Sequence, residues 1–188
     1  MTRALRKTAR TVLLAALVLT VFGSGTTWAG SAAELERDGR AALDKLYAST
    51  PAAKELAKKA KAILVFPMVV KAGLFVGGQF GEGVLFKNGQ ASGYYNTVEA
   101  SFGLQAGGQT FGYALFFITD EALKYLDDSA GWEIGTGPTV VVVDKGYASS
   151  LSSTTLQDDV YAFFFSQEGL MAGLGLKGSK ITKFTPDE

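Results

Sequence analysis

Two kinds of sequence meet near Ile63, and this division limits the folds that the chain can adopt. Before Ile63, Ala, Leu, Glu and Lys recur at the three- and four-residue spacings of amphipathic helices. After it, Gly, Val, Phe and Tyr dominate, and these residues favour strands and turns. Helices followed by strands predict an α+β fold. We expect N-terminal helices, then a curved, Gly-rich antiparallel β-sheet of barrel-like shape with one short inserted helix.

The first 29 residues have the layout of a secretory signal peptide. A basic start, Arg3 to Arg10, precedes an apolar run from Val12 to Phe22, and small residues end the segment at Ala29. The run is shorter than the roughly 20 residues of a transmembrane helix. We expect residues 1–29 to be cleaved, leaving residues 30–188 as a single domain in the periplasm or cell envelope. A retained N-terminal anchor is the alternative.

Charge and composition exclude several functions. The chain balances 18 basic against 18 acidic residues, and loss of residues 1–29 leaves a net charge of −4. An acidic domain is a poor nonspecific binder of nucleic acid, which requires Lys and Arg on the phosphates. The chain contains no His and no Cys, which excludes disulfides, Ser-His and Cys-His nucleophiles, and imidazole or thiolate metal sites. We therefore expect no enzyme activity, no cofactor and no metal.

The helical part predicts two helices. The first spans Ser31 to Ser49, although Gly39 in its middle costs about 1 kcal/mol relative to Ala. Thr50-Pro51 begins a second helix, because Thr is a good N-cap and Pro suits the first helical position. Its apolar side continues to Leu64. Three lysines share its other side at spacings of four and three residues: Lys54, Lys58 and Lys61.

Turn signals divide the remaining chain into strands. Asn88-Gly89 predicts a tight hairpin, since a type I′ turn needs positive φ at both central residues. Thr119 is the expected cap of a short helix, Asp120 to Asp128. The β-branched run Thr139 to Val143 has no polar face, which predicts a central strand buried on both sides. Val160 to Ser166 and Leu170 to Leu176 are expected to form a closing pair of strands.

Glycines occur where strands are expected. Gly73, Gly77 and Gly81 follow at intervals of four, so in a strand they face the same side. Glycine inside a strand marks a bend, a bulge or the close approach of a backbone or ligand. Strong curvature of the sheet is one interpretation, and a ligand groove free of side chains is the other.

Several of these glycines belong to blocks that resemble the SYLF domain. Its opening signature resembles Phe66–Gly73 and Gly77–Val84 of this chain. Its second block resembles Gly103–Gly108 together with Ile118–Leu123. A Gly-Pro block corresponds to Gly135–Pro138, and the closing hairpin to Tyr161–Ser166 with Gly169–Gly178. The resemblance extends from about Ala52 to Phe184.

The resemblance implies a lipid-binding module. Eukaryotic members bind phosphoinositide head groups and membranes through basic residues and an amphipathic helix, and some bind actin. The positions implied to contact an anionic head group or line its groove are Lys54, Lys58, Lys59, Lys61, Lys71, Gly73, Gly77 and Gly81. Ser92–Tyr95 stands where the family often shows a Trp-Ser-x-Pro-like segment, so a phosphoinositide pocket is not implied.

The export signal decides which family properties are transferred. An exported bacterial-type protein does not meet actin, so actin binding is not expected. Phosphatidylglycerol, cardiolipin or lipopolysaccharide are the conceivable anionic partners. Two alternatives remain open: a structural or protein-interaction domain of the envelope without a lipid ligand, and a small outer-membrane β-barrel. The two helices and the all-apolar run Val140 to Val143 fit the latter poorly.

Overall fold

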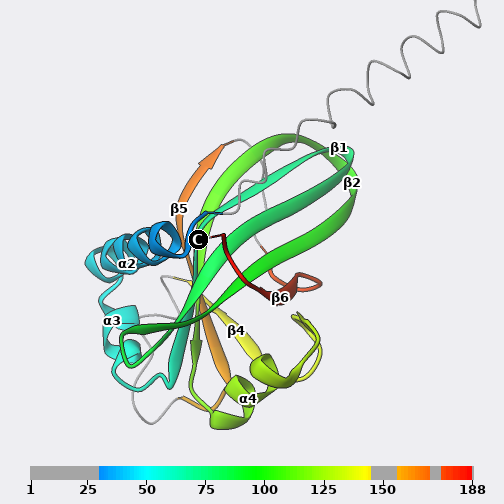
Figure 1. Ribbon diagram of the computed structural model, residues 1–188. Coiled ribbons are helices and arrows are strands. Elements are labelled where there is room, and N and C mark those ends of the chain that lie inside the picture. Colours follow the sequence, from blue (N-terminus) through cyan, green and yellow to red (C-terminus); the bar gives the residue numbers. More distant parts are fainter. Residues whose placement is uncertain (1–29, 145–155, 170–174, 188) are drawn as a thin grey trace, which may run out of the picture.

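The computed structural model describes residues 30–144, 156–169 and 175–187 (Figure 1). The elements in chain order are helices α2 (Ala32–Ser49) and α3 (Pro51–Ala57), strands β1 (Ala62–Lys87) and β2 (Gln90–Phe117), helix α4 (Asp120–Asp128), and strands β3 (Trp132–Glu133), β4 (Val140–Val143), β5 (Val160–Gly169) and β6 (Lys180–Phe184). Helices come first, a curled sheet follows, and one short helix interrupts it. The predicted α+β class is confirmed.

The sheet is built around one long hairpin. β1 and β2 pair antiparallel from Ala62 opposite Phe117 to Lys87 opposite Gln90, with irregularities that bend the ladder. The turn is Asn88-Gly89, where φ is 51° and 75°. Both residues have the positive φ that a type I′ turn requires, so the predicted hairpin is confirmed.

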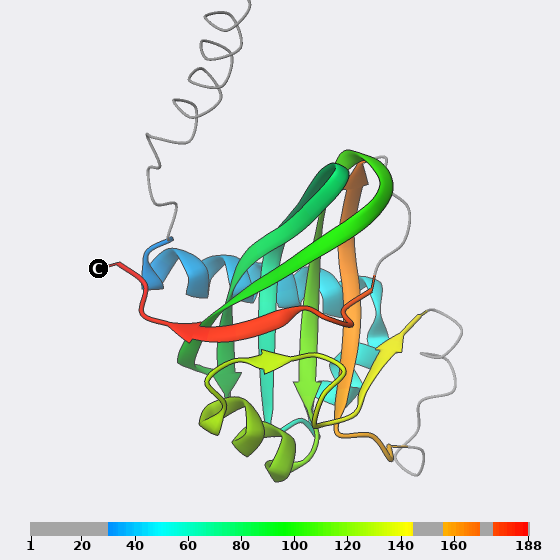
Figure 2. The same cartoon turned by 90° about the vertical axis from the view of Figure 1, so that its right-hand side faces the viewer.

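The long hairpin curls back over itself, and glycines make the close approach possible. A Cβ on Gly83 would lie closer than 3 Å to the carbonyl oxygen of Val65, and one on Gly81 would lie 2.9 Å from that of Met68. The later half of β1 therefore passes against its own first half (Figure 2). Any side chain at these two positions would push the strands apart.

The remaining strands extend the curled sheet on both sides of β2. β5 pairs antiparallel with one half of β2, β6 pairs with the other half, and β3 pairs with β6. Among the described strands, β4 pairs only with β5, in parallel, and lies at the edge of the sheet. The prediction of a central strand buried on both sides was wrong, since Val142 is 45% exposed.

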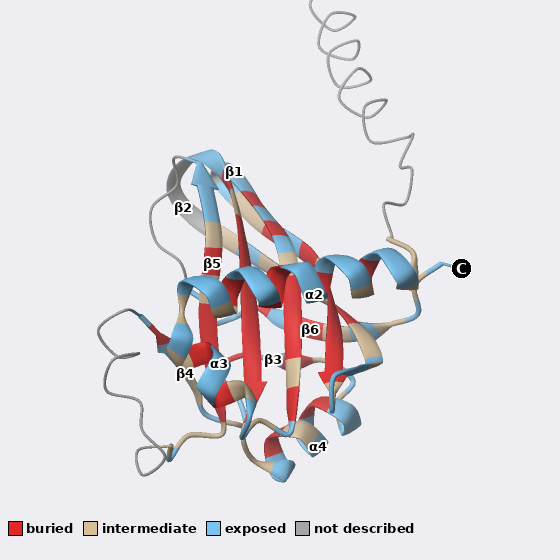
Figure 3. Ribbon diagram, turned by 90° about the vertical axis from the view of Figure 1, so that its left-hand side faces the viewer, coloured by how far each residue is buried: buried red, intermediate tan, exposed pale blue. Residues whose placement is uncertain are grey.

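Each face of the sheet has its own apolar core. The outer core packs α2 and α3 against the sheet, and its members include Leu46, Leu56, Phe116 and Phe163. The inner core fills the curl, is closed by α4, β3 and β6, and includes Trp132. Figure 3 shows α2 crossing strands whose buried residues lie beneath it.

Local signals explain where the helices begin and end. Ser31 accepts a hydrogen bond from Glu34 N while the Glu34 side chain accepts one from Ser31 N, a capping box that starts α2. Thr119 accepts from Ala122 N and starts α4 as predicted. The second predicted helix is shorter than expected, because α3 ends at Ala57 and Ala62 already belongs to β1.

The predicted closing pair of strands is only partly within the described residues. β5 covers Val160 to Ser166 and continues to Gly169. Most of the second strand, residues 170–174, lies outside the described residues. β6 was not predicted, since its five residues carry two lysines and no strong apolar run.

Candidate functional site

Four of the predicted lysines lie together on one stretch of surface. Lys54 is on α3, Lys58 and Lys59 follow its last turn, and Lys61 immediately precedes β1. All four side chains are exposed. Because α3 ends early, they do not share the face of one continuous helix, but the turn after α3 keeps them within a single short segment. We call these four residues the lysine segment.

Two of the four lysines are already ion-paired. Lys58 Nζ lies 2.7 Å from Glu55 Oε2, and Lys61 Nζ lies 3.0 Å from Asp120 Oδ2. Lys58 holds the pKa of the exposed Glu55 carboxyl below its usual range, first by its hydrogen bond and then by its charge. Exposed pairs of this kind contribute little and are screened by salt. A competing anion can therefore replace either carboxylate.

A cleft of about 590 Å³ opens beside the lysine segment. It lies where α2, the turn after α3 and the Asn88-Gly89 turn meet. Its charged lining consists of Arg40, Lys58 and Lys61 against Asp44. Its apolar lining comes from Leu43, Ala57, Ala60, Ala62, Ile63 and Phe86. The cleft thus places three cations around an apolar floor, which suits a molecule with an anionic head and an apolar body.

Arg40, which was not predicted from the sequence, also lines the cleft. Its Nη1 donates a hydrogen bond of 2.9 Å to the carbonyl oxygen of Gly89, and its guanidinium lies 4.9 Å from the centre of the Phe86 ring. Both contacts hold the charge at the cleft, and the second is a cation–π interaction. Arg40 is more than twelve residues from the nearest predicted lysine, so no spacing rule connects them. The hairpin turn that brings them together is visible only in the fold.

One uncharged residue of the cleft is also affected by its surroundings. Tyr47 is about half buried, and burial raises the pKa of its phenol, with a smaller contribution from nearby Asp44. Tyr47 therefore stays neutral over the physiological range. It offers a hydroxyl and an aromatic ring at the cleft wall without adding negative charge.

Lys71 does not belong with the other lysines, and this part of the predicted site needs correction. Its side chain is 9% exposed and its Nζ lies 3.8 Å from Glu99 Oε1. Lys71 faces the interior of the curled sheet, because side chains alternate along β1 and its neighbours Val70 and Ala72 take the outer face. It is not on the lysine segment.

The three predicted groove glycines also have a different environment from the one expected. A Cβ on Gly73 would lie 2.5 Å from Gly77 Cα, and a Cβ on Gly77 would lie 2.9 Å from the Ala72 carbonyl oxygen. Gly81 faces Met68 and Val69 in the same way. The chain's own backbone therefore occupies the space beside all three glycines. They permit curvature, the first of the two interpretations, and we leave them out of the candidate site.

Other surfaces of the described residues are less suited to an anionic ligand. A cleft of about 640 Å³ near β4 and β5 contains Lys45 as its only cation, next to Asp144. No cluster of three or more acidic, His or Cys residues that could hold a metal occurs within residues 30–144, 156–169 and 175–187. In the same residues, no helix is both long enough and apolar enough to span a bilayer.

The described residues thus form an α+β domain with a curled sheet and a cleft lined by Arg40, Lys58 and Lys61. Residues 98–186 match the family model described as Ysc84, Las17-binding protein actin regulator. The matched family is the SYLF-domain family, which the sequence blocks also resemble. Its members are lipid-binding or actin-regulating proteins. The match includes every resembling block from Gly103 onward, whereas Phe66–Val84 precedes it. No curated protein matches the chain.

Proposed function

We propose that this protein is an exported lipid-binding module that attaches to anionic membrane surfaces through the lysine segment and the adjoining cleft. The observation that carries the proposal is the cleft itself, in which Arg40, Lys58 and Lys61 surround an apolar floor. A lipid phosphate would lie among the cations, and the first carbons of its chains would lie on Ile63 and Phe86. No catalytic step is needed.

Electrostatics set the expected strength of this binding. A basic residue near an anionic membrane contributes about 1 kcal/mol, and this contribution falls off within a Debye length. Lys54 and Lys59 form no ion pair within the described part of the chain, so their full charge is available. Lys58 and Lys61 must first exchange a carboxylate for a lipid phosphate. We therefore expect weak binding that decreases as salt is added.

Vesicle co-sedimentation tests the proposal. The wild-type protein should bind vesicles of phosphatidylglycerol and phosphatidylcholine, and not vesicles of phosphatidylcholine alone. The triple variant Lys54→Ala/Lys58→Ala/Lys61→Ala should bind at least about tenfold more weakly, because three contributions near 1 kcal/mol are removed.

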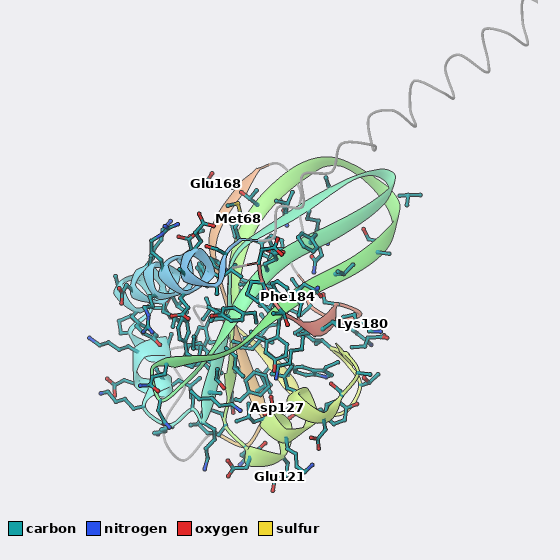
Figure 4. The ribbon with its side chains drawn as sticks, in the orientation of Figure 1. Met68, Glu121, Asp127, Glu168, Lys180 and Phe184 are labelled. Atoms are coloured by element: carbon teal, nitrogen blue, oxygen red, sulfur yellow. The ribbon has the colours of Figure 1, made fainter. Side chains whose placement is uncertain are left out.

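A second triple variant controls for total charge. Lys177→Ala/Lys180→Ala/Lys183→Ala removes the same charge from the β6 region. Figure 4 shows Lys180 on the side of the molecule away from α2 and α3. This variant should bind almost as well as wild type. If both variants lost affinity equally, binding would depend on net charge alone and the cleft would be rejected as the binding site. If the wild-type protein bound neutral vesicles equally well, an electrostatic site would be rejected.

Export is a separate part of the proposal. Residues 1–29 have the basic start, apolar run and small residues of a signal peptide. Localisation in the periplasm or envelope follows if this segment is cleaved. Fractionation of cells, with the N-terminus of the recovered protein sequenced, should find the protein outside the cytoplasm and beginning near Gly30. An uncleaved cytoplasmic product would reject export while leaving lipid binding open.

A further inference from the structure

Inside the curled sheet, away from the lysine segment, the polar residues of the interior gather at one place. The interior polar cluster consists of Lys71, Gln79, Thr97, Glu99, Gln109 and Ser179. It contains every polar or charged residue that is buried in the described part of the chain, and Glu99 joins it with a side chain only 14% exposed. An interior otherwise made of aromatic and aliphatic side chains thus has a single polar region.

Strand pairing brings the cluster together. Lys71 lies directly opposite Gln109 in the β1–β2 ladder, and Gln79 lies directly opposite Glu99 farther along the same hairpin. Opposite residues share a face of the sheet. The curl of the hairpin then brings the two pairs toward each other, and Lys71 Nζ lies 3.8 Å from Glu99 Oε1. The cluster exists because the hairpin bends.

Hydrogen bonds satisfy only part of the cluster. Gln79 Nε2 donates to Ser179 Oγ at 2.9 Å, and Ser179 Oγ donates to Glu99 Oε2 at 2.9 Å. Four buried side-chain atoms of the described chain have no partner: Gln79 Oε1, Thr97 Oγ1, Gln109 Nε2 and the Tyr113 hydroxyl. Three belong to the cluster. The Tyr113 hydroxyl lies beside that of Thr97; burial raises the pKa of its phenol, the Thr97 hydroxyl lowers it, and the Glu99 carboxylate raises it.

Unpartnered buried groups are rare in proteins because they are costly, and each needs an explanation. Here Gln79 Oε1 and Gln109 Nε2 are an unpartnered acceptor and donor in one place, and the Thr97 and Tyr113 hydroxyls lie beside each other next to them. Lys71 and Glu99 are also too far apart to form a hydrogen bond with each other, so part of their hydrogen-bonding capacity is unused. The cluster therefore has the composition of a site that a polar molecule completes.

The mixture of groups selects the chemistry of that molecule. Lys71 and Glu99 cancel each other's charge, and Glu99 would repel a phosphate or carboxylate. Gln79 Oε1 and Glu99 need donors, whereas Lys71 and Gln109 Nε2 need acceptors. A hydroxyl group both donates and accepts, so neighbouring hydroxyls on one molecule can satisfy both kinds of group. The residues also differ in depth. Lys71, Gln109 and Glu99 retain slight exposure, whereas Thr97 and Tyr113 are fully buried and form the deep end of the cluster.

We propose that the interior polar cluster is a second binding site, which takes a polyhydroxyl group between Lys71, Gln79, Thr97, Glu99 and Gln109. The group belongs either to a free polyol or to the polyol head of a lipid. This inference is independent of the lysine segment, because none of the cluster residues lines the basic cleft.

The side-chain amide NMR signals of Gln79 and Gln109 report on this site. Titration with sorbitol should shift both signals in a saturable manner and leave that of the exposed Gln90 unchanged. A parallel titration with short-chain phosphatidylglycerol below its micelle concentration tests a lipid-borne polyol. Whichever compound shifts the two interior amides identifies the source. The proposal would be overturned if neither compound caused saturable shifts, or if bound water were detected as the only occupant.

A matched pair of variants tests the deep end of the site. Thr97→Val replaces the buried hydroxyl by a methyl group of the same shape, and affinity for the shifting compound should fall at least threefold. Thr110→Val makes the same change on the other face of β2, next to Gln109, and should not alter affinity. Amide dispersion in the same spectra shows whether each variant is folded. Unchanged affinity in folded Thr97→Val would also overturn the assignment.

Discussion

Gly39 of α2 lies against Val84 of β1, so closely that a Cβ on the glycine would stand less than 3 Å from Val84 Cγ1. In the sequence this glycine is only a weak point of a helix. In the fold it is buried at the place where α2 crosses the sheet. The helix can approach the strands this closely because residue 39 has no side chain, and this crossing sets the position of Arg40 over the cleft.

Gly39→Ala should therefore destabilise the protein, although alanine is the better helix former by about 1 kcal/mol. The new methyl group would overlap Val84 and the Phe86 ring, and overpacking of this kind costs about 1–3 kcal/mol. Urea unfolding measures the change. The double variant Gly39→Ala/Val84→Ala should recover part of the loss. A Gly39→Ala protein more stable than wild type would show that α2 does not pack as described.

Gly83→Ala should be more harmful, because the obstacle is backbone. The added methyl would meet the Val65 carbonyl oxygen and the Phe66 ring, neither of which can rotate away. We expect a loss of about 3 kcal/mol or more, or failure to fold. Gly175→Ala is the matched control, since nothing lies within 4 Å of its Cβ position. Equal stability of the two variants would contradict the overlap between the halves of β1.

Local signals made part of this fold predictable, and long-range curvature made the rest unpredictable. Asn88-Gly89 and Thr119 act within a few residues, so their turn and cap follow from sequence alone. The position of β4 in the sheet was predicted wrongly, because an all-apolar run is compatible with an edge strand that packs against other parts of the chain as well as with a central strand. The glycines at 73, 77 and 81 were open to two interpretations, because a missing side chain admits a backbone or a ligand equally.

Asp159 should contribute stability that depends on pH. It accepts hydrogen bonds from Thr139 N, Thr139 Oγ1 and Thr119 Oγ1, joining the start of β4 to the cap of α4. The bond from the Thr139 backbone holds the pKa of this carboxyl below its usual range, and the two side-chain bonds add to the effect against the opposing influence of burial. The folded state therefore favours the carboxylate.

A carboxyl whose pKa is lowered on folding stabilises the protein above its unfolded pKa of about 4. That stabilisation is lost as the pH falls through the lower folded value. Asp159→Asn should be less stable than wild type by about 1 kcal/mol at pH 7, since the group is only partly buried. Thermal unfolding from pH 7 to pH 2.5 should show this difference shrinking below pH 4. A constant difference would contradict the assignment.

Arg40→Ala should weaken binding to anionic vesicles severalfold, because it removes a cation and its stacking on Phe86 from the cleft. Arg37→Ala is the matched control. Arg37 is one turn earlier on α2, is exposed, and pairs with Asp38 at 3.0 Å without lining the cleft. Co-sedimentation at low salt should separate the two variants. Equal losses would indicate attraction by overall charge.

The candidate site was predictable only where its residues are neighbours in sequence. Lys54, Lys58, Lys59 and Lys61 lie within eight positions, so they stay close even though the helix ends sooner than expected. Lys71 is ten positions farther on, in a strand, where alternation turns it inward. Arg40 reaches the cleft through tertiary contacts, as do the apolar residues of its floor.

The most direct test of membrane attachment maps the bound surface on the protein. Vesicles of phosphatidylglycerol and phosphatidylcholine that carry a spin-labelled lipid broaden the amide signals of residues near the membrane. We expect the strongest broadening at residues 40–47 and 54–63, with Lys180–Phe184 on β6 little affected. Broadening centred on β6, or spread evenly over the described residues, would contradict attachment through the lysine segment and its cleft.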